Sequence, residues 1–210
     1  MRLMVIRVLA LCLTVTLALA VSPVLADSPT DAVKSVVNEV VRILKDPALK
    51  APGMKQKRRE MVKQLVDRRF DYKEMAKRSL AATWRSLSAS QRREFVRLFG
   101  RLLEASYSGK VMNYRGEKVD FRPAIMQGAD YAEVRSVVLR KNDRIPITYR
   151  LIREPQGWMV YDVVIEGVSL VSNYRSQFRR VIRQSSYHDL VRRLQNKIRE
   201  LERIKEISPS

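Results

Sequence analysis

Residues 131–165 read YAEVRSVVLRKNDRIPITYRLIREPQGWMVYDVVI, and this stretch decides the fold class. Three runs, 131–140, 145–153 and 158–165, are typical of β-strands and are separated by short turns. Strands joined by such short turns pair antiparallel. A fourth run with alternating side chains, 118–122, comes before them. The sequence therefore predicts a four-stranded antiparallel sheet.

Helix-forming patterns stand before and after this sheet. Four residue pairs are typical of helix N-termini: Ser28 with Asp31, Asp71 with Glu74, Ser88 with Gln91, and Ser186 with Asp189. Apolar residues at helical spacing follow them, as in amphipathic helices that cover a core. We expect one α+β domain over 27–210, with helices over 27–115, the sheet over 116–166 and C-terminal helices over 167–210. Helices from both ends would wrap a curved sheet.

The N-terminus has the pattern of a secretory signal peptide over residues 1–26. Arg2 and Arg7 give a positive start, 8–21 is mostly apolar, and Pro23 interrupts the run. Small or aliphatic residues precede a cleavage position after Ala26. A signal anchor that stays in the membrane is the alternative, but the run is shorter than the roughly 20 residues of a membrane span. The sequence predicts an exported protein.

Composition narrows the classes of function further. The chain of 210 residues has 41 Lys and Arg, 22 Asp and Glu, one His and one Cys. Two of the basic residues and the Cys lie in 1–26, so the mature chain would keep 39 basic against 22 acidic residues. A disulfide framework, a thiolate zinc site and a multi-histidine metal centre are excluded. For an exported chain, this charge favours anionic headgroups or an acidic protein partner over nucleic acid.

Residues that could carry catalysis are scarce. His188 has no partner at a recognisable spacing, and no Ser has a His or Lys placed to activate it. We therefore predict that the protein is not an enzyme and holds no metal or cofactor. One alternative stays open, in which Tyr161 and Asp162 form the acid–base pair of a small isomerase-like enzyme.

Basic doublets recur on the predicted helices. Any single doublet is explained as a solvated helix face, but together they exceed what solubility requires. We predict that Arg92, Arg93, Arg179 and Arg180 dock an acidic or anionic partner.

Three segments near the C-terminus form a specific signature: WMVYDV (158–163), EGVSLV (166–171) and NYRSQF (173–178). On these residues the chain resembles the MlaC family, the periplasmic component of the Mla phospholipid transport system, also called the toluene-tolerance auxiliary protein. Phe70-Asp71-Tyr72 and the helix start over 88–99 are similar too. The resemblance spans essentially the whole chain after residue 26.

The resemblance implies a fold like that of nuclear transport factors with added helices, and a soluble, monomeric periplasmic shuttle. Phospholipid would be its bound ligand. The implied partners are an inner-membrane ABC transporter with an MCE-domain ring and an outer-membrane lipoprotein–porin complex. A second hypothesis is a cationic periplasmic adaptor or membrane-surface module with a filled core and no lipid cavity.

The strand over 158–165 suggests where a lipid binds. Strict alternation places Trp158, Val160, Asp162 and Val164 on one face. An unpaired carboxylate is costly in a dry core, so we expect this face to line a cavity mouth, with helix residues 98–102 opposite. The predicted lipid-contacting residues are Leu98, Phe99, Leu102, Tyr149, Leu151, Trp158, Val160, Val164, Val168 and Tyr174.

Overall fold

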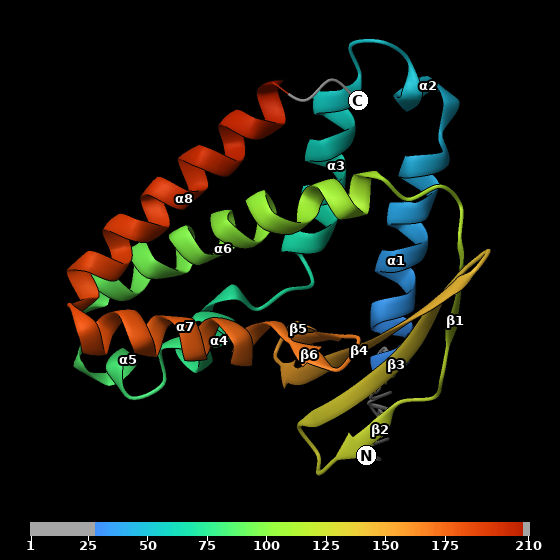
Figure 1. The fold of residues 1–210 in the computed structure, drawn as a ribbon. Coiled ribbons are helices and arrows are strands. Elements are labelled where there is room, and N and C mark those ends of the chain that lie inside the picture. Colours follow the sequence, from blue (N-terminus) through green and yellow to red (C-terminus); the bar gives the residue numbers. More distant parts are fainter. Residues whose placement is uncertain (1–27, 208–210) are drawn as a thin grey trace, which may run out of the picture.

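The computed structural model describes residues 28–207, so the predicted signal peptide, 1–26, lies outside the described residues. The chain folds as an α+β protein in which helices flank a curved antiparallel sheet (Figure 1). The helices are α1 (Pro29–Lys45), α2 (Pro47–Lys50), α3 (Lys55–Asp67), α4 (Tyr72–Leu80), α5 (Thr83–Ser86), α6 (Ala89–Met112), α7 (Leu170–Gln184) and α8 (Tyr187–Ile207). The strands are β1 (Lys118–Phe121), β2 (Ile125–Gln127), β3 (Tyr131–Arg140), β4 (Asp143–Glu154), β5 (Gly157–Ile165) and β6 (Val168–Ser169).

Capping hydrogen bonds confirm the predicted helix starts. Each bond satisfies a backbone donor that the first turn of a helix leaves unpaired. The N–H groups of Asp31, Glu74, Gln91 and Asp189 donate to the side chains of Ser28, Asp71, Ser88 and Ser186 over 2.8–3.2 Å. The four-residue helices α2 and α5 were not predicted, because one helical turn is too short to show a periodic pattern.

The sheet has six strands rather than the four predicted. Its order is β1-β3-β4-β5-β6, and β2 pairs with β3 next to β1 on the same edge. All of these pairs are antiparallel. The two additional strands have only three residues (β2) and two residues (β6), so neither can display an alternating pattern.

A β-bulge in β5 changes which side chains share a face. Arg150 of β4 pairs with Asp162, but the next residue, Leu151, pairs with Val160. Tyr161 is therefore an extra residue in β5, and an extra residue reverses the alternation beyond it. The prediction that Val160 and Asp162 lie on one face is wrong for this reason.

The bulge divides β5 between two sides of the sheet. On the side that we call the α1 side, Ala32 and Val33 of α1 pack against buried sheet residues. Those residues are Ala132, Val134, Leu151, Trp158, Val160 and Val163. On the opposite side, which we call the α7 side, the Asp162 carboxylate accepts a hydrogen bond from the N–H of Val171 in α7. Val163 thus shares the α1 side with Val160, while Asp162 faces away from both.

A second core, the helical core, lies among α4, α6, α7 and α8. Figure 1 shows α6 and α8 side by side and α4 beside α7. The rings of Phe95, Phe99, Tyr174 and Phe178 form its centre, with contacting ring centroids 5.2–6.0 Å apart. A smaller cluster holds α1, α2 and α3 together. The helices therefore bury most of their apolar surface against one another, and α1 covers the sheet.

Candidate functional site

The α1 side of the sheet is apolar but incompletely covered by protein atoms. Leu151, Trp158 and Val160 are at most 3% exposed. Other residues of the same cluster stay half-buried, among them Val37, Phe121, Ile147, Tyr149 and Ile165. Apolar surface that the protein leaves partly accessible is surface that an apolar ligand can remove from water.

The predicted lipid-contacting residues fall mainly into two separate cores. Four of them lie on the α1 side: Tyr149, Leu151, Trp158 and Val160. Four lie in the helical core: Leu98, Phe99, Leu102 and Tyr174. The prediction that helix residues 98–102 face the strand residues across one cavity is therefore wrong. The spacing in α6 identifies a buried stripe, but this stripe packs against neighbouring helices instead of the sheet.

The remaining two predicted residues lie apart from both cores. Val164 is half-buried on the α7 side, in register with Thr148 and Ser169. Val168 lies in the short edge strand β6 and is 56% exposed. Lipid contact at these two positions stays a prediction.

Asp162 lies in a closed hydrogen-bond network rather than at a cavity mouth. Its carboxylate accepts hydrogen bonds from Arg150 Nη1 (3.1 Å), Ser169 Oγ (2.6 Å) and the N–H of Val171 (3.0 Å). Because Val171 is in the first turn of α7, the carboxylate also favours that helix end. Arg150 donates in addition to Glu133 (3.2 Å). These partners satisfy a side chain that is 2% exposed, and both of its oxygens are engaged, which disfavours an acid–base role.

The hydroxyl groups of Tyr149 and Ser136 lie on the otherwise apolar α1 side. Burial raises the pKa of the Tyr149 phenol above its ordinary value. Ser136 of β3 is 1% exposed and was not predicted as a site residue. Its spacing of two from Val134 is the signal that could have placed it on this face.

The predicted docking arginines differ in their surroundings. Arg92 donates to the carbonyl oxygens of Trp84 and Arg85 at 3.0 Å each, and its guanidinium lies 5.6 Å from the centroid of the Trp84 ring. It therefore satisfies carbonyl groups of α5, an internal role that was not predicted. Arg93 and the 179–180 doublet are exposed.

Helix α7 carries positive charge that no acidic residue on the helix opposes. Arg175, Arg179, Arg180 and Arg183 are exposed, and we call them the α7 arginine face. Among the side chains of residues 28–204, none of these four forms an ion pair. On α8, by contrast, the 192–193 doublet pairs with Asp189. The two neighbouring helices therefore present different electrostatic surfaces.

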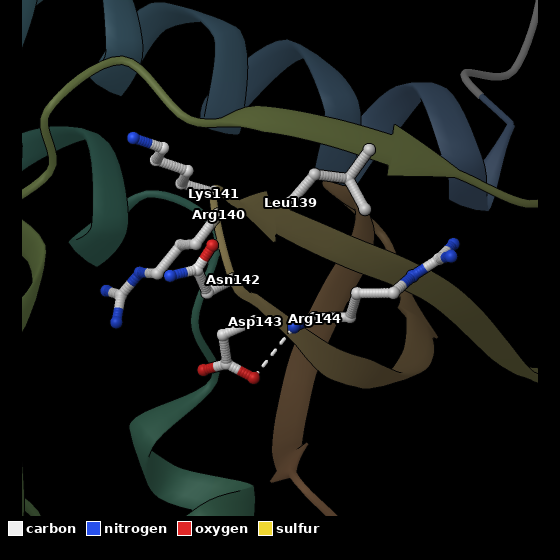
Figure 2. A pocket seen from close by; sticks show the side chains of 6 residues that line it. All are labelled: Leu139, Arg140, Lys141, Asn142, Asp143 and Arg144. Carbon is white, nitrogen blue, oxygen red and sulfur yellow. Dashed lines mark hydrogen bonds between the residues drawn. The ribbon is translucent and has the colours of Figure 1, made fainter.

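Two surface hollows lie away from the predicted lipid-contacting residues. One of about 700 Å³ lies at the tip of the β3–β4 hairpin and is lined by residues 139–144 (Figure 2). There the N–H of Arg144 donates to Asp143 Oδ1 (2.7 Å). A second of about 350 Å³ lies between α4 and α5 beside Arg78 and Trp84. The first is open and mostly charged, so it suits solvent better than acyl chains.

The described residues offer little else that could bind a membrane or a metal. Across residues 28–207, every helix is too short or too polar to cross a bilayer. The side chains of residues 28–204 contain no group of three His, Cys, Asp or Glu that could hold a metal ion. The α1 side therefore stands as the candidate ligand site.

A family model and a solved structure both match most of this chain. The family model described as MlaC protein matches residues 34–196. The chain belongs to the MlaC family. A solved structure, that of the phospholipid-binding protein from Ralstonia solanacearum in complex with a phospholipid, is similar to it with a TM-score of 0.75 and 29% identity. That match covers 83% of this chain and 99% of the Ralstonia chain. The family resemblance carried by residues 158–178 is thereby confirmed.

A curated relative matches part of the chain. The intermembrane phospholipid transport system binding protein MlaC of Haemophilus influenzae is 26% identical over 121 residues. The match covers 55% of this chain and 56% of the relative, so the chain spans little more than half of that relative's length. Membership of the MlaC family rests on the longer family match.

Proposed function

We propose that the chain is a phospholipid-binding protein of an intermembrane phospholipid transport system, and that acyl chains bind against the α1 side of the sheet. The observation that carries the proposal is the likeness to the Ralstonia protein solved with a phospholipid. The name of the Haemophilus relative supports the transport role. The partly uncovered apolar residues of the α1 side favour this surface as the place of binding.

The energetics of apolar burial suit a carrier that is neither an enzyme nor a cofactor protein. Each acyl CH₂ removed from water contributes about 0.8 kcal/mol, so two long chains hold a lipid without covalent chemistry. The same affinity makes spontaneous release slow, and a partner that accepts the chains is required for delivery.

Transport also requires export, and we propose that the mature chain is periplasmic and begins at Asp27. Sequencing the N-terminus of exported protein tests the processing step. A full-length product retained in the membrane would contradict both the cleavage after Ala26 and the shuttle.

The α7 arginine face is proposed to dock acidic surfaces of the transport partners. These would be the inner-membrane ABC transporter with its MCE-domain ring and the outer-membrane lipoprotein–porin complex. Exposed arginines without ion-pair partners accelerate association with acidic surfaces. The docking prediction thus centres on Arg179 and Arg180, since Arg92 is engaged internally, and docking by the exposed Arg93 stays a prediction.

Extraction of the purified mature protein with organic solvent, followed by mass spectrometry, tests phospholipid binding directly. We expect diacyl phospholipid in the extract, and a native mass above that of the polypeptide by one or more lipids. The α7 arginine face also fits the second candidate function, a cationic adaptor without a lipid cavity. That candidate gives a native mass equal to the bare polypeptide and an empty extract.

A further inference from the structure

The α1 side carries a pair of hydroxyl groups in an otherwise apolar setting. Ser136 of β3 and Tyr149 of β4 are diagonal neighbours, because Val134 pairs with Tyr149 and Ser136 pairs with Ile147. The other direct cross-strand neighbours are Phe121 beside Ser136 and Val163 beside Tyr149. Both hydroxyls therefore lie among apolar side chains, close to the centre of the sheet.

The two hydroxyls do not make all of the hydrogen bonds they could with the described residues. Ser136 Oγ is buried and has no hydrogen-bond partner. Burial raises the pKa of the Tyr149 phenol, and the nearby Ser136 hydroxyl partly offsets this effect. The two hydroxyls are thus close to each other, although Ser136 Oγ forms no hydrogen bond of ordinary geometry with a described residue. The phenol itself stays protonated at neutral pH, so its O–H is a hydrogen-bond donor.

The chemistry of the site indicates which ligand group would accept a hydrogen bond from the Tyr149 O–H. Tyr149 is half-buried among apolar side chains, and a tyrosine O–H in such a setting usually finds an acceptor, because leaving it unpaired costs free energy. A phosphate is a poor candidate here, since the four cross-strand neighbours are apolar and provide no charge to balance it. A carboxylic ester carbonyl is neutral, accepts a hydrogen bond and donates none. It also lies at the junction between the acyl chains and the glycerol of a diacyl phospholipid.

We propose that the Tyr149 O–H donates a hydrogen bond to an ester carbonyl of the bound phospholipid, and that Ser136 is a positioning residue that orients the phenol. This inference rests on the proposed lipid-binding function and makes it more specific. It assigns the α1 side a preference for ester-linked over ether-linked glycerophospholipids. It also fixes how deep the glycerol end sits relative to the sheet.

A competition experiment tests the preference. The mature protein is loaded from vesicles that contain equal amounts of a diacyl and a dialkyl phosphatidylethanolamine with matched chains, and native mass spectrometry measures the bound ratio. A net hydrogen bond corresponds to about 3- to 10-fold preference for the diacyl lipid in the wild type. Tyr149→Phe should bring the ratio close to one while loading continues, and Ser136→Ala should lower it partway. Thr148→Val, which removes a hydroxyl from the opposite side of β4, should leave the ratio unchanged.

A spectroscopic measurement separates a hydrogen bond from a packing effect. With a ¹³C-labelled ester carbonyl, the infrared band should shift to lower frequency in the wild type, and this shift should disappear in Tyr149→Phe. Equal loading of both lipids by the wild type, or an unchanged ratio in Tyr149→Phe, would overturn the inference and leave lipid binding intact. Failure of the wild type to load either lipid would instead overturn the proposed function itself.

Discussion

The two sides of one sheet use polar groups in opposite ways. On the α7 side, Glu133, Arg150 and Asp162 stand in register across three strands, and Arg150 donates hydrogen bonds to both carboxylates. On the α1 side, Ser136 and Tyr149 lie among apolar neighbours, and the buried Ser136 Oγ has no hydrogen-bond partner among the described residues. The first arrangement fixes the start of α7 on the sheet. The second leaves apolar surface and a donor available to a ligand.

The bulge at Tyr161 makes this division possible. Without the extra residue, Asp162 would share the α1 side with Val160, and its charge would stand in the apolar cluster. With it, β5 supplies buried apolar residues to the α1 side on both sides of the bulge and still directs the carboxylate to α7. An irregularity of one residue therefore separates the ionic side from the apolar side.

Removing the Asp162 carboxylate from the α7 side should have the largest effect on the free energy of unfolding. Asp162→Ala removes the acceptor for Arg150, Ser169 and the N–H of Val171, leaving groups without partners. Removing one partner of a buried pair costs about 3–5 kcal/mol, and we expect about 2–4 kcal/mol because the Arg150 side chain is 38% exposed and can be hydrated. Urea denaturation measures the free energy of unfolding. Asp143→Ala at the exposed hairpin tip serves as the control and should change it by less than about 0.5 kcal/mol.

Adjacent residues of β5 on opposite sides test which side holds the lipid. Val163→Trp adds bulk on the α1 side and should lower the amount of co-purified phospholipid severalfold. Val164→Trp adds the same bulk on the α7 side and should keep the lipid. Each substitution should cost about 1–3 kcal/mol of stability through overpacking. Loss of lipid from Val164→Trp alone would restore the face assignment that strict alternation predicts.

The contrast between α7 and α8 provides a matched test of docking. Arg179→Gln with Arg180→Gln should slow association with the MCE-domain ring about tenfold at low salt, and the loss should shrink as salt rises. Arg192→Gln with Arg193→Gln removes the same charge from a doublet that Asp189 already neutralises in part, so its effect should be smaller. Stopped-flow measurement of the association rate compares them. Equal losses would mean that net charge alone matters.

The smallest expected effect is a dependence of stability on alkaline pH. Because burial raises the pKa of Tyr149 in the folded state, its contribution to stability is fully present below pH 10 and is lost as the pH rises above that value. Tyr149→Phe should therefore lose less stability than the wild type between pH 9 and about pH 11. Thermal unfolding at each pH measures the difference. Parallel curves for the two proteins would show that the phenol is not desolvated.

Local patterns in the sequence determined most of the secondary structure and the family. A capping pair such as Ser88 with Gln91 acts over three residues, so its outcome is visible in the chain itself. The runs predicted over 131–140 and 145–153 likewise correspond to β3 and β4, although β4 begins two residues earlier, at Asp143, and ends one later, at Glu154. The segments at 158–178 carried the family resemblance that the family match confirms.

Tertiary structure decided how these elements meet. The stripe on α6 was recognised, but its packing against helices rather than the sheet depends on where α4 and α8 dock. The partners of Asp162 come from β4, β6 and α7, and the bulge that turns it toward them exists only in the register with β4. The physical reason is that capping and alternation act between near neighbours in the chain. Which face becomes charged and which stays open to a ligand depends on contacts between segments far apart in the sequence.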